Sequence, residues 1–429
     1  MKVSFYNLGC KVNLADISRI GKQFEDEGHE IVEFEQDSDI VLINTCTVTH
    51  RADADCRKVV RRALRKSPDA FVGVVGCFAQ LKPDEVVKID GVDAVFGQKE
   101  KFEIPQLIQD FTKKENASIL VGDMNDIPFH SSAVSDNVGR TRAVFKIQDG
   151  CEYNCTFCTI PMARGGFRSM DFEELPKHIN DFYEGGFREV VLSGINLGEY
   201  KAKSGEKFKD VVSYLNDYDK KIRYRISSIE PNLLKDEILD VIQNSEKFVD
   251  HFHIPLQSGS QDILMKMKRR YRAKNYRKLI LDIKVRMPDC GIGADVIVGF
   301  PGESDELFQE TYDFINELPI SYLHVFTYSE RDNTVAASLE NPVPHDIRKE
   351  RTAQLRRLSD KKRSDFYKSQ IGKIKRVIPE TFVESSGMWR AWTDNYVNVI
   401  FPGSKNLSKE FHNVKLIEFA DEKVIAELV

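Results

Sequence analysis

A repeated alternation of short apolar runs with amphipathic helical patterns is the feature that most constrains the fold of this chain. Each apolar run has the length and the β-branched content of a buried strand, and most runs are followed by helical periodicity. Two parallel strands need a crossover connection, so such alternation predicts parallel sheets covered by helices. We therefore expect an α/β protein, and the 429 residues are enough for about three domains.

The first series predicts a Rossmann-like parallel sheet over residues 1–118. Its expected elements are strands at 2–6, 39–43 and 71–75 and helices at 13–27 and 49–66. Cys10, Cys46 and Cys77 each stand just beyond the C-terminal end of one of these strands. Ligands gather at that edge of a doubly wound sheet, so we expect the three thiols to meet in space.

A single free cysteine is more often a small buried apolar side chain than a ligand. We keep that interpretation for Cys56, which lies in a helical pattern, and for Cys290, which lies in a turn. For the other cysteines, the matching positions at strand ends favour ligands.

A polar segment, 119–137, reads as a linker, and a second series begins after it. Its expected strands are 143–147, 189–192, 223–226, 251–254, 293–298 and 322–326, with helices at 172–183, 275–287 and 307–318. Six strands with crossovers predict a partial (β/α)6 barrel over 138–366, in which chemistry is placed at the C-terminal strand ends.

Cys151, Cys155 and Cys158 occupy the loop after the first strand of this barrel. Three thiols are one short of closing a tetrahedral metal site, and the vacant position leaves room for a reacting molecule. Thiolates also suit iron–sulfur clusters. The alternative is a structural zinc loop whose fourth ligand lies elsewhere in the sequence.

The C-terminal part combines a basic helical pattern at 341–363 with short strands over 367–429. The strands are expected at 373–378, 396–401, 414–419 and 424–428. They predict a small antiparallel β-barrel, a shape that often binds looped RNA. A second basic cluster, with an interleaved aromatic residue, is predicted to contact RNA phosphates and bases: Lys268, Arg269, Arg270 and Tyr271. Its alternative is a solvated helix face.

The composition and the absence of certain segments indicate where in the cell the protein is expected to be found. The sequence has no signal-peptide pattern at its start and no apolar run of the roughly 20 residues that span a bilayer. We expect a cytoplasmic protein with no membrane partner, in which the eight cysteines are ligands or thiols. The net charge of −5 gives no general attraction to nucleic acid. A monomer is the default expectation.

The Cys-x3-Cys-x2-Cys loop, with Phe157 before its last cysteine, resembles the radical S-adenosylmethionine superfamily. The resemblance implies that Cys151, Cys155 and Cys158 hold a [4Fe–4S] cluster whose open iron binds the amine and carboxylate of S-adenosylmethionine. It places Phe157 beside the adenine. Further cofactor contacts are expected from Gly194, Asn196, Glu230 and Gln257. For Glu230 and Gln257, the alternative is an ordinary solvated loop side chain.

The cysteines of the first domain extend this likeness to the methylthiotransferases, which carry a second [4Fe–4S] cluster. By this resemblance, Cys10, Cys46 and Cys77 are its ligands. The motifs are those of the type that methylthiolates N6-threonylcarbamoyladenosine beside the tRNA anticodon: LGCKVN at 8–13, NTCTVT at 44–49, IPMARG at 160–165 and SSIEP at 227–231. The final barrel resembles the RNA-binding TRAM domain.

The family implies a division of labour between two clusters. An electron from a low-potential donor generates a 5′-deoxyadenosyl radical at the first cluster, and the radical takes hydrogen from C2 of the adenine. The second cluster carries sulfur from a sulfur source, which another S-adenosylmethionine methylates. No catalytic side chain beyond the cluster ligands is expected. Arg164, Arg168 and the loop after Asn196 are candidates, by position, for contacting the threonylcarbamoyl group.

Two alternatives remain open at this stage. The substrate could be isopentenyladenosine in tRNA, which related methylthiotransferases modify. From a different class, the chain could be an RNA-binding zinc protein without catalysis.

Overall fold

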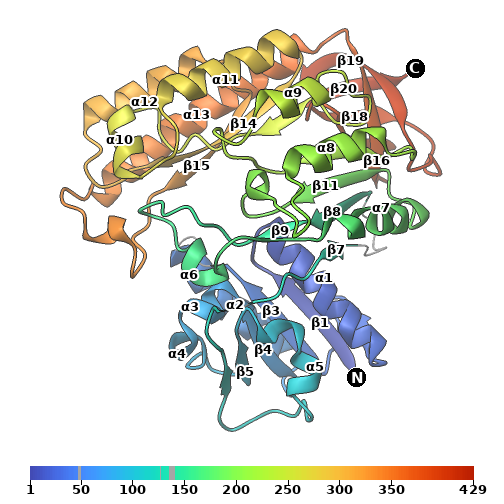
Figure 1. Cartoon of the computed structure of the whole chain (residues 1–429). Coiled ribbons are helices and arrows are strands. Elements are labelled where there is room, and N and C mark those ends of the chain that lie inside the picture. The colour runs from blue at the N-terminus through green and yellow to red at the C-terminus, as the bar shows by residue number, and fades with distance from the viewer. Residues whose placement is uncertain (47–49, 126, 135–140) are drawn as a thin grey trace.

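The computed structural model describes residues 1–46, 50–125, 127–134 and 141–429. Figure 1 shows three parts in chain order: an N-terminal sheet domain, a central domain of strands covered by helices, and a C-terminal β-barrel. Within these ranges, no helix combines the length and the hydropathy that crossing a lipid bilayer requires.

The N-terminal domain is a six-stranded sheet of order β2-β1-β3-β4-β5-β6 in which every pairing is parallel. Its elements are β1 Lys2–Asn7, α1 Lys11–Asp26, β2 Glu30–Val32, β3 Ile40–Thr45, α2 His50–Lys66, β4 Phe71–Gly76, α3 Cys77–Leu81, α4 Pro83–Val86, β5 Ala94–Phe96, η1 Glu100–Phe102, α5 Ile104–Leu107 and β6 Ser118–Leu120. Strands β3 and β4 are buried throughout because helices cover both faces of the sheet. The predicted parallel sheet is confirmed; three strands of three residues, β2, β5 and β6, were not predicted.

The segment predicted as a linker, 119–137, is paired at both of its described ends. It begins inside β6 of the first sheet. It then contributes β7, Ser132–Val134, which pairs antiparallel with the first strand of the central domain. Residues 135–137 of the predicted linker lie outside the described ranges.

The central domain contains all six predicted parallel strands, arranged as two sheets of order β12-β11-β8-β7 and β13-β14-β15. Its strands are β8 Arg142–Lys146, β9 Gln148–Asp149, β10 Arg168–Ser169, β11 Glu189–Ser193, β12 Arg223–Ile226, β13 His251–His253, β14 Gly291–Val298 and β15 Tyr322–Thr327. Its helices are α6 Ile160–Arg164, η2 Phe172–Glu174, α7 Leu175–Glu184, η3 Leu197–Glu199, α8 Phe208–Asp217, α9 Asp236–Ile242, α10 Gln261–Lys266, α11 Ala273–Arg286, α12 Asp305–Glu317, η4 Val335–Ser338 and α13 His345–Ser369. An isolated parallel bridge, Tyr224 to Phe248, connects β12 with the segment before β13. The barrel is partial because β15 pairs only with β14 among the described strands and does not close onto the first sheet.

The C-terminal part is a closed barrel of order β16-β17-β18-β20-β19, as the sequence predicted. Its strands are β16 Ile374–Val383, β17 Met388–Thr393, β18 Asn398–Pro402, β19 His412–Ala420 and β20 Lys423–Leu428. Strand β17 was not predicted. Every pairing is antiparallel except that of β18 with β20.

A buried carboxylate organises the contact between the central strands and this barrel. Glu189, the first residue of β11, accepts hydrogen bonds from Arg223 Nε at 2.6 Å and from Arg225 Nε at 2.8 Å. The two guanidinium groups then donate to barrel carbonyls, with Arg223 reaching Trp392 O at 3.2 Å. All three charged side chains are buried. One acidic group thus compensates two arginines that hold the barrel in place.

We expect Glu189→Gln to lower the free energy of unfolding by about 3–5 kcal/mol, because it leaves two buried guanidinium groups without a carboxylate. Urea unfolding followed by tryptophan fluorescence is a suited measurement, since both tryptophans, Trp389 and Trp392, lie on β17. The arginines hold the pKa of Glu189 below its ordinary value despite its burial. The difference in unfolding free energy between the wild type and Glu189→Gln should therefore decrease as the pH falls below the ordinary carboxyl range.

Glu410→Gln is the matched control. Glu410 also joins the barrel to the central domain, through Arg188, but it is half exposed. Its loss should cost about 0–1 kcal/mol. Equal effects of the two substitutions would show that Glu189 is not the organising charge.

Candidate active site

A tight loop between β9 and α6 carries the three cysteines of the central domain. Gly150 begins it with φ +72°, and a Cβ at that residue would lie 2.0 Å from the carbonyl oxygen of Gly166. The amide of Cys151 donates to Gly165 O at 3.2 Å, which closes the loop onto the end of α6. Thr156 anchors the other side through hydrogen bonds to the carbonyls of Lys266 and Met267. These contacts fix the direction of all three thiols.

The three thiols are partly or fully enclosed. Burial raises the pKa of Cys151 and of Cys158 to about 12, so both are protonated thiols unless a metal displaces the proton. Three thiol ligands leave one coordination position open, as a cluster that binds a reacting molecule requires.

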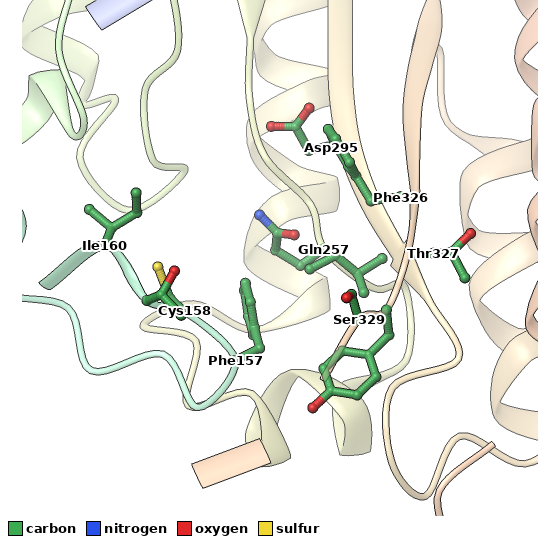
Figure 2. A pocket seen from close by; sticks show the side chains of 11 residues that line it. Phe157, Cys158, Ile160, Gln257, Asp295, Phe326, Thr327 and Ser329 are labelled. Carbon is green, nitrogen blue, oxygen red and sulfur yellow. The ribbon is translucent and has the colours of Figure 1, made fainter. Parts of the chain in front are cut away.

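A pocket of about 220 Å³ opens directly beside this loop (Figure 2). Phe157, Cys158 and Ile160 form one wall, and residues of β14 and β15 form the other. Gln257 lines it with a left-handed backbone, φ 65°, and its Oε1 is buried without a hydrogen-bond partner. Apolar walls with an unsatisfied acceptor suit a nucleoside-containing molecule that reaches the cysteines. The residues present therefore fit the predicted cluster and S-adenosylmethionine.

The structure separates the predicted cofactor contacts into two groups. Phe157 and Gln257 line the pocket. Gly194, Asn196 and Glu230 do not line it, and each has a local role. A Cβ on Gly194 would lie 2.8 Å from Gln148 Oε1, and the backbone amide of Asn196 donates to that same oxygen at 2.8 Å. The side-chain amide of Asn196 is buried and makes no hydrogen bond of good geometry. Their roles as cofactor contacts remain predictions.

Glu230 is engaged by Arg269, and this contact changes the interpretation of the basic cluster. The Arg269 side chain is only 3% exposed, forms an ion pair with Glu230, and donates from Nη1 to Cys155 Sγ at 3.1 Å. Tyr271 is also buried and donates to the carbonyls of Pro255 and Leu256. This placement does not fit the RNA contact predicted for Arg269 and Tyr271.

Lys268 and Arg270, by contrast, are exposed, so their contact with RNA stays a prediction. Arg270 lies over the ring of Tyr153, with 3.9 Å between its guanidinium carbon and the ring centroid. Both residues lie beside the mouth of the cysteine loop.

Sequence reasoning missed Glu199, which lies beside the same loop. Burial raises the pKa of its carboxyl, and the side chain forms hydrogen bonds with Cys151 and the backbone of Glu152. The motif after β11 gave only a weak signal for it, because a single acidic residue in a loop is usually solvated.

The N-terminal cysteines occupy the positions that the sheet predicted. Cys10 follows β1 and is the N-cap of α1, Cys46 follows β3, and Cys77 begins α3 after β4. Strands β1, β3 and β4 are neighbours in the sheet, so the three residues share its C-terminal edge. Cys10 and Cys77 are close enough for their charges to interact. Cys56 and Cys290 are instead buried among apolar residues of two hydrophobic cores.

Arg164 lies between the two cysteine sets. It ends α6, which begins two residues after Cys158, and α6 packs against α3. Its guanidinium donates to Asp149 Oδ1 at 2.9 Å and to Asp16 Oδ2 at 3.2 Å, and it forms a hydrogen bond with Cys77. Lys146 and Lys101 complete this buried network through Asp16, at 2.5 Å and 2.6 Å. The charges thus join the N-terminal and central domains.

The two arginines that the sequence suggested as contacts of the threonylcarbamoyl group both belong to this network. Arg164 is fully buried, and Arg168 pairs with Asp149 at 3.3 Å. The guanidinium of Arg164 is therefore closed to a substrate, whereas that of Arg168 is partly exposed. That assignment was by position alone, and position did not show the buried partners.

Known proteins share this combination of domains. Residues 2–97 match the uncharacterized protein family UPF0004, and residues 145–315 match the Radical SAM superfamily. The threonylcarbamoyladenosine tRNA methylthiotransferase MtaB of Bacillus subtilis is 38% identical over 97% of this chain and 94% of its own length. The tRNA-2-methylthio-N(6)-dimethylallyladenosine synthase of Fusobacterium nucleatum is 32% identical over 100% of both.

Among solved structures, the radical S-adenosylmethionine methyltransferase TsrM of Kitasatospora setae has a TM-score of 0.58 at 15% identity, over 78% of this chain and 77% of its own. The fold and the cysteine loop define a radical S-adenosylmethionine enzyme, which carries a [4Fe–4S] cluster and binds S-adenosylmethionine. More narrowly, the chain belongs to the methylthiotransferase family, as its resemblance predicted.

We expect Arg269→Met to shift the reduction potential of the cluster that Cys151, Cys155 and Cys158 are predicted to hold to a more negative value, because it removes a positive charge and a hydrogen bond from Cys155. The shift should be on the order of tens of millivolts, given about 59 mV per tenfold change for one electron. A redox titration followed by electron paramagnetic resonance measures it. Arg270→Met, a change at the exposed neighbour, is the control. An unchanged potential in Arg269→Met would contradict this role.

Arg164→Met should loosen the contact between the N-terminal and central domains, because Asp16 and Asp149 lose a shared buried cation. The expected cost is about 3–5 kcal/mol. The hydrogen-exchange rates of the backbone amides in α1, α3 and α6 report the loosening without any assay of activity. Arg168→Met, which removes a partly exposed partner of the same Asp149, should have a clearly smaller effect. Unchanged exchange in Arg164→Met would mean that other contacts hold the domains together.

Proposed function

We propose that this enzyme replaces the hydrogen on C2 of N6-threonylcarbamoyladenosine, beside the tRNA anticodon, with a methylthio group. The observation that carries the proposal is the near full-length similarity to methylthiotransferases named for that nucleoside in several bacteria. When bound, the [4Fe–4S] cluster and S-adenosylmethionine supply one-electron chemistry that reaches a C–H bond with no acidic proton.

The chain itself supplies position and enclosure. Cys151, Cys155 and Cys158 would hold the first cluster, and Cys10, Cys46 and Cys77 would hold a second. Arg164 and its carboxylate partners keep these sets at one fixed separation. A reactive intermediate must meet its reaction partner before anything else, so this fixed separation decides the product. The apolar walls around Phe157 exclude water from the same space.

RNA must bring its base into this enclosure. The target adenosine has to leave the anticodon-loop stack, which costs a few kcal/mol that contacts with the RNA must offset. Exposed Lys268 and Arg270 beside the cysteine loop would contact phosphates, and the C-terminal barrel would hold the stem-loop. An electron donor and a sulfur source complete the reaction. The enzyme would work as a monomer in the cytoplasm.

Nucleoside mass spectrometry of tRNA from a strain lacking the gene tests the substrate. We expect loss of the methylthiolated threonylcarbamoyl nucleoside and its return when the wild-type gene is restored. Loss of only the methylthiolated isopentenyl nucleoside would assign the alternative substrate, for which the Fusobacterium nucleatum relative is named. Zinc without iron in anaerobically purified protein would instead support the non-catalytic alternative.

Cys46→Ala should preserve cleavage of S-adenosylmethionine to 5′-deoxyadenosine but reduce methylthiolation at least about 100-fold, because the second cluster loses one of three ligands. Cys155→Ala should abolish both activities. Cys56→Ala, which removes a buried thiol of the same domain that is not a predicted ligand, should retain both. Chromatographic detection of 5′-deoxyadenosine and mass spectrometry of the RNA separate the two steps. Loss of cleavage in folded Cys46→Ala would show that the clusters do not divide the work.

A further inference from the structure

Three polar side chains meet on adjacent strands of the second central sheet. His253 is on β13, Asp295 on β14 and His324 on β15, and Asp295 and His324 are direct partners in the strand register. His253 Nε2 lies 2.8 Å from Asp295 Oδ1, and His324 Nδ1 lies 3.3 Å from the same oxygen. Burial alone would raise the pKa of Asp295, but its bonds to the two imidazoles hold it below the ordinary value. One carboxylate thus orients both imidazoles.

This cluster connects with the pocket beside the cysteine loop. Asp295 lines that pocket, and Figure 2 shows Gln257 between Asp295 and Cys158. His253 is buried behind Asp295, whereas the side chain of His324 is 56% exposed. His324 lies two residues before Phe326 on β15, so the two side chains share one face of the strand, and Phe326 lines the pocket.

Lys11 approaches the same region from the N-terminal domain. Its side chain is accessible to solvent, yet surrounding protein lowers its pKa, with Arg142 and Arg225 adding to the effect and Asp295 opposing it. These electrostatic interactions place the ammonium group of Lys11 on the side of α1 that packs against the central strands.

Lys11 differs from the other cations around it. Arg142 pairs with Glu380, and Arg225 pairs with Glu189. Across the residues that the structure describes, Lys11 has no carboxylate partner. A desolvated ammonium that forms no ion pair costs free energy unless a ligand supplies the anion.

A divalent cation is the other ligand that two histidines and one aspartate could hold. The charges oppose it. The only acidic group of the cluster already accepts from both imidazoles, and Lys11 adds positive charge nearby. An anionic group of the substrate fits this arrangement better than a cation.

We propose that Lys11 and the His253–Asp295–His324 cluster bind the carboxylate-bearing side chain of the substrate nucleoside. Lys11 pairs with the carboxylate, and His324, oriented by Asp295, forms hydrogen bonds with the polar atoms beside it. This inference rests on the proposed function, because the threonylcarbamoyl group carries a carboxylate. An isopentenyl group is apolar and would leave these polar groups desolvated without partners, which is how a site rejects an analogue.

The test uses one anticodon stem-loop RNA in three forms: with N6-threonylcarbamoyladenosine, with its methyl ester, and with isopentenyladenosine. The full-length enzyme with both clusters should prefer the acid over the ester by about 10- to 100-fold in kcat/KM. Lys11→Met and His324→Leu should each reduce that ratio toward one. Lys22→Met, at an exposed lysine on the same helix as Lys11, should keep it. Iron content verifies cluster loading, since Lys11 follows Cys10.

Each other outcome overturns the inference in a distinct way. An unchanged acid-to-ester ratio in both variants would show that these residues do not read the carboxylate. Loss of RNA-free 5′-deoxyadenosine formation in His324→Leu would assign the cluster to the cofactor. A bound divalent metal lost in Asp295→Asn would identify a metal site. Wild-type enzyme acting equally on acid and ester would leave the proposed function intact, whereas activity on isopentenyl RNA alone would overturn that function.

Discussion

The buried ion network around Arg164 is the interaction on which the rest of the structure depends. Burial alone would raise the pKa of Asp16, but Lys101, Lys146 and Arg164 together hold it below its ordinary value. Such buried charges add little net stability compared with apolar packing, yet breaking one of them is costly. What these buried charges contribute is geometry, because their hydrogen bonds form only in one arrangement of the two domains. Two domains joined by directional hydrogen bonds have one register, whereas two apolar faces could slide.

That register matters because the two predicted cluster sites, one in each cysteine set, lie on different domains. Cys77 begins α3, Cys158 precedes α6, and Arg164 contacts both regions. The separation of the two sets is therefore fixed by the same side chain that ties the domains together. Glu189 does the corresponding work at the other end of the central domain, where it fixes the barrel. Each interface is specified by a buried carboxylate shared between basic partners.

Much of this architecture was predictable, because strand length, helical periodicity and cysteine position are local properties. Strands such as β11 and β14 have the apolar, β-branched pattern of buried strands, and all six predicted cysteine ligands lie where the topology places them. Strands of three residues show almost no period, so β2, β5 and β6 escaped prediction, and β13 was predicted only as part of the longer segment 251–254. Arg269 was misassigned for a different reason. Sequence shows a run of basic residues, but only the left-handed turn at Lys268 shows which of them returns to the interior.

Pairing separates the structural cations from those available to a ligand. Arg164, Arg225 and Arg269 are buried, and each is satisfied by a carboxylate of the chain. Lys268 and Arg270 are exposed, and Lys11 is desolvated without an acidic partner. The net charge of −5 sums over all of them and so hides this division. A cation that is paired with a buried carboxylate helps to fix the arrangement of the chain. A cation without such a partner is available to bind an anionic ligand. By that criterion, the positions open to an anion are Lys11 and the two exposed residues beside the cysteine loop, Lys268 and Arg270.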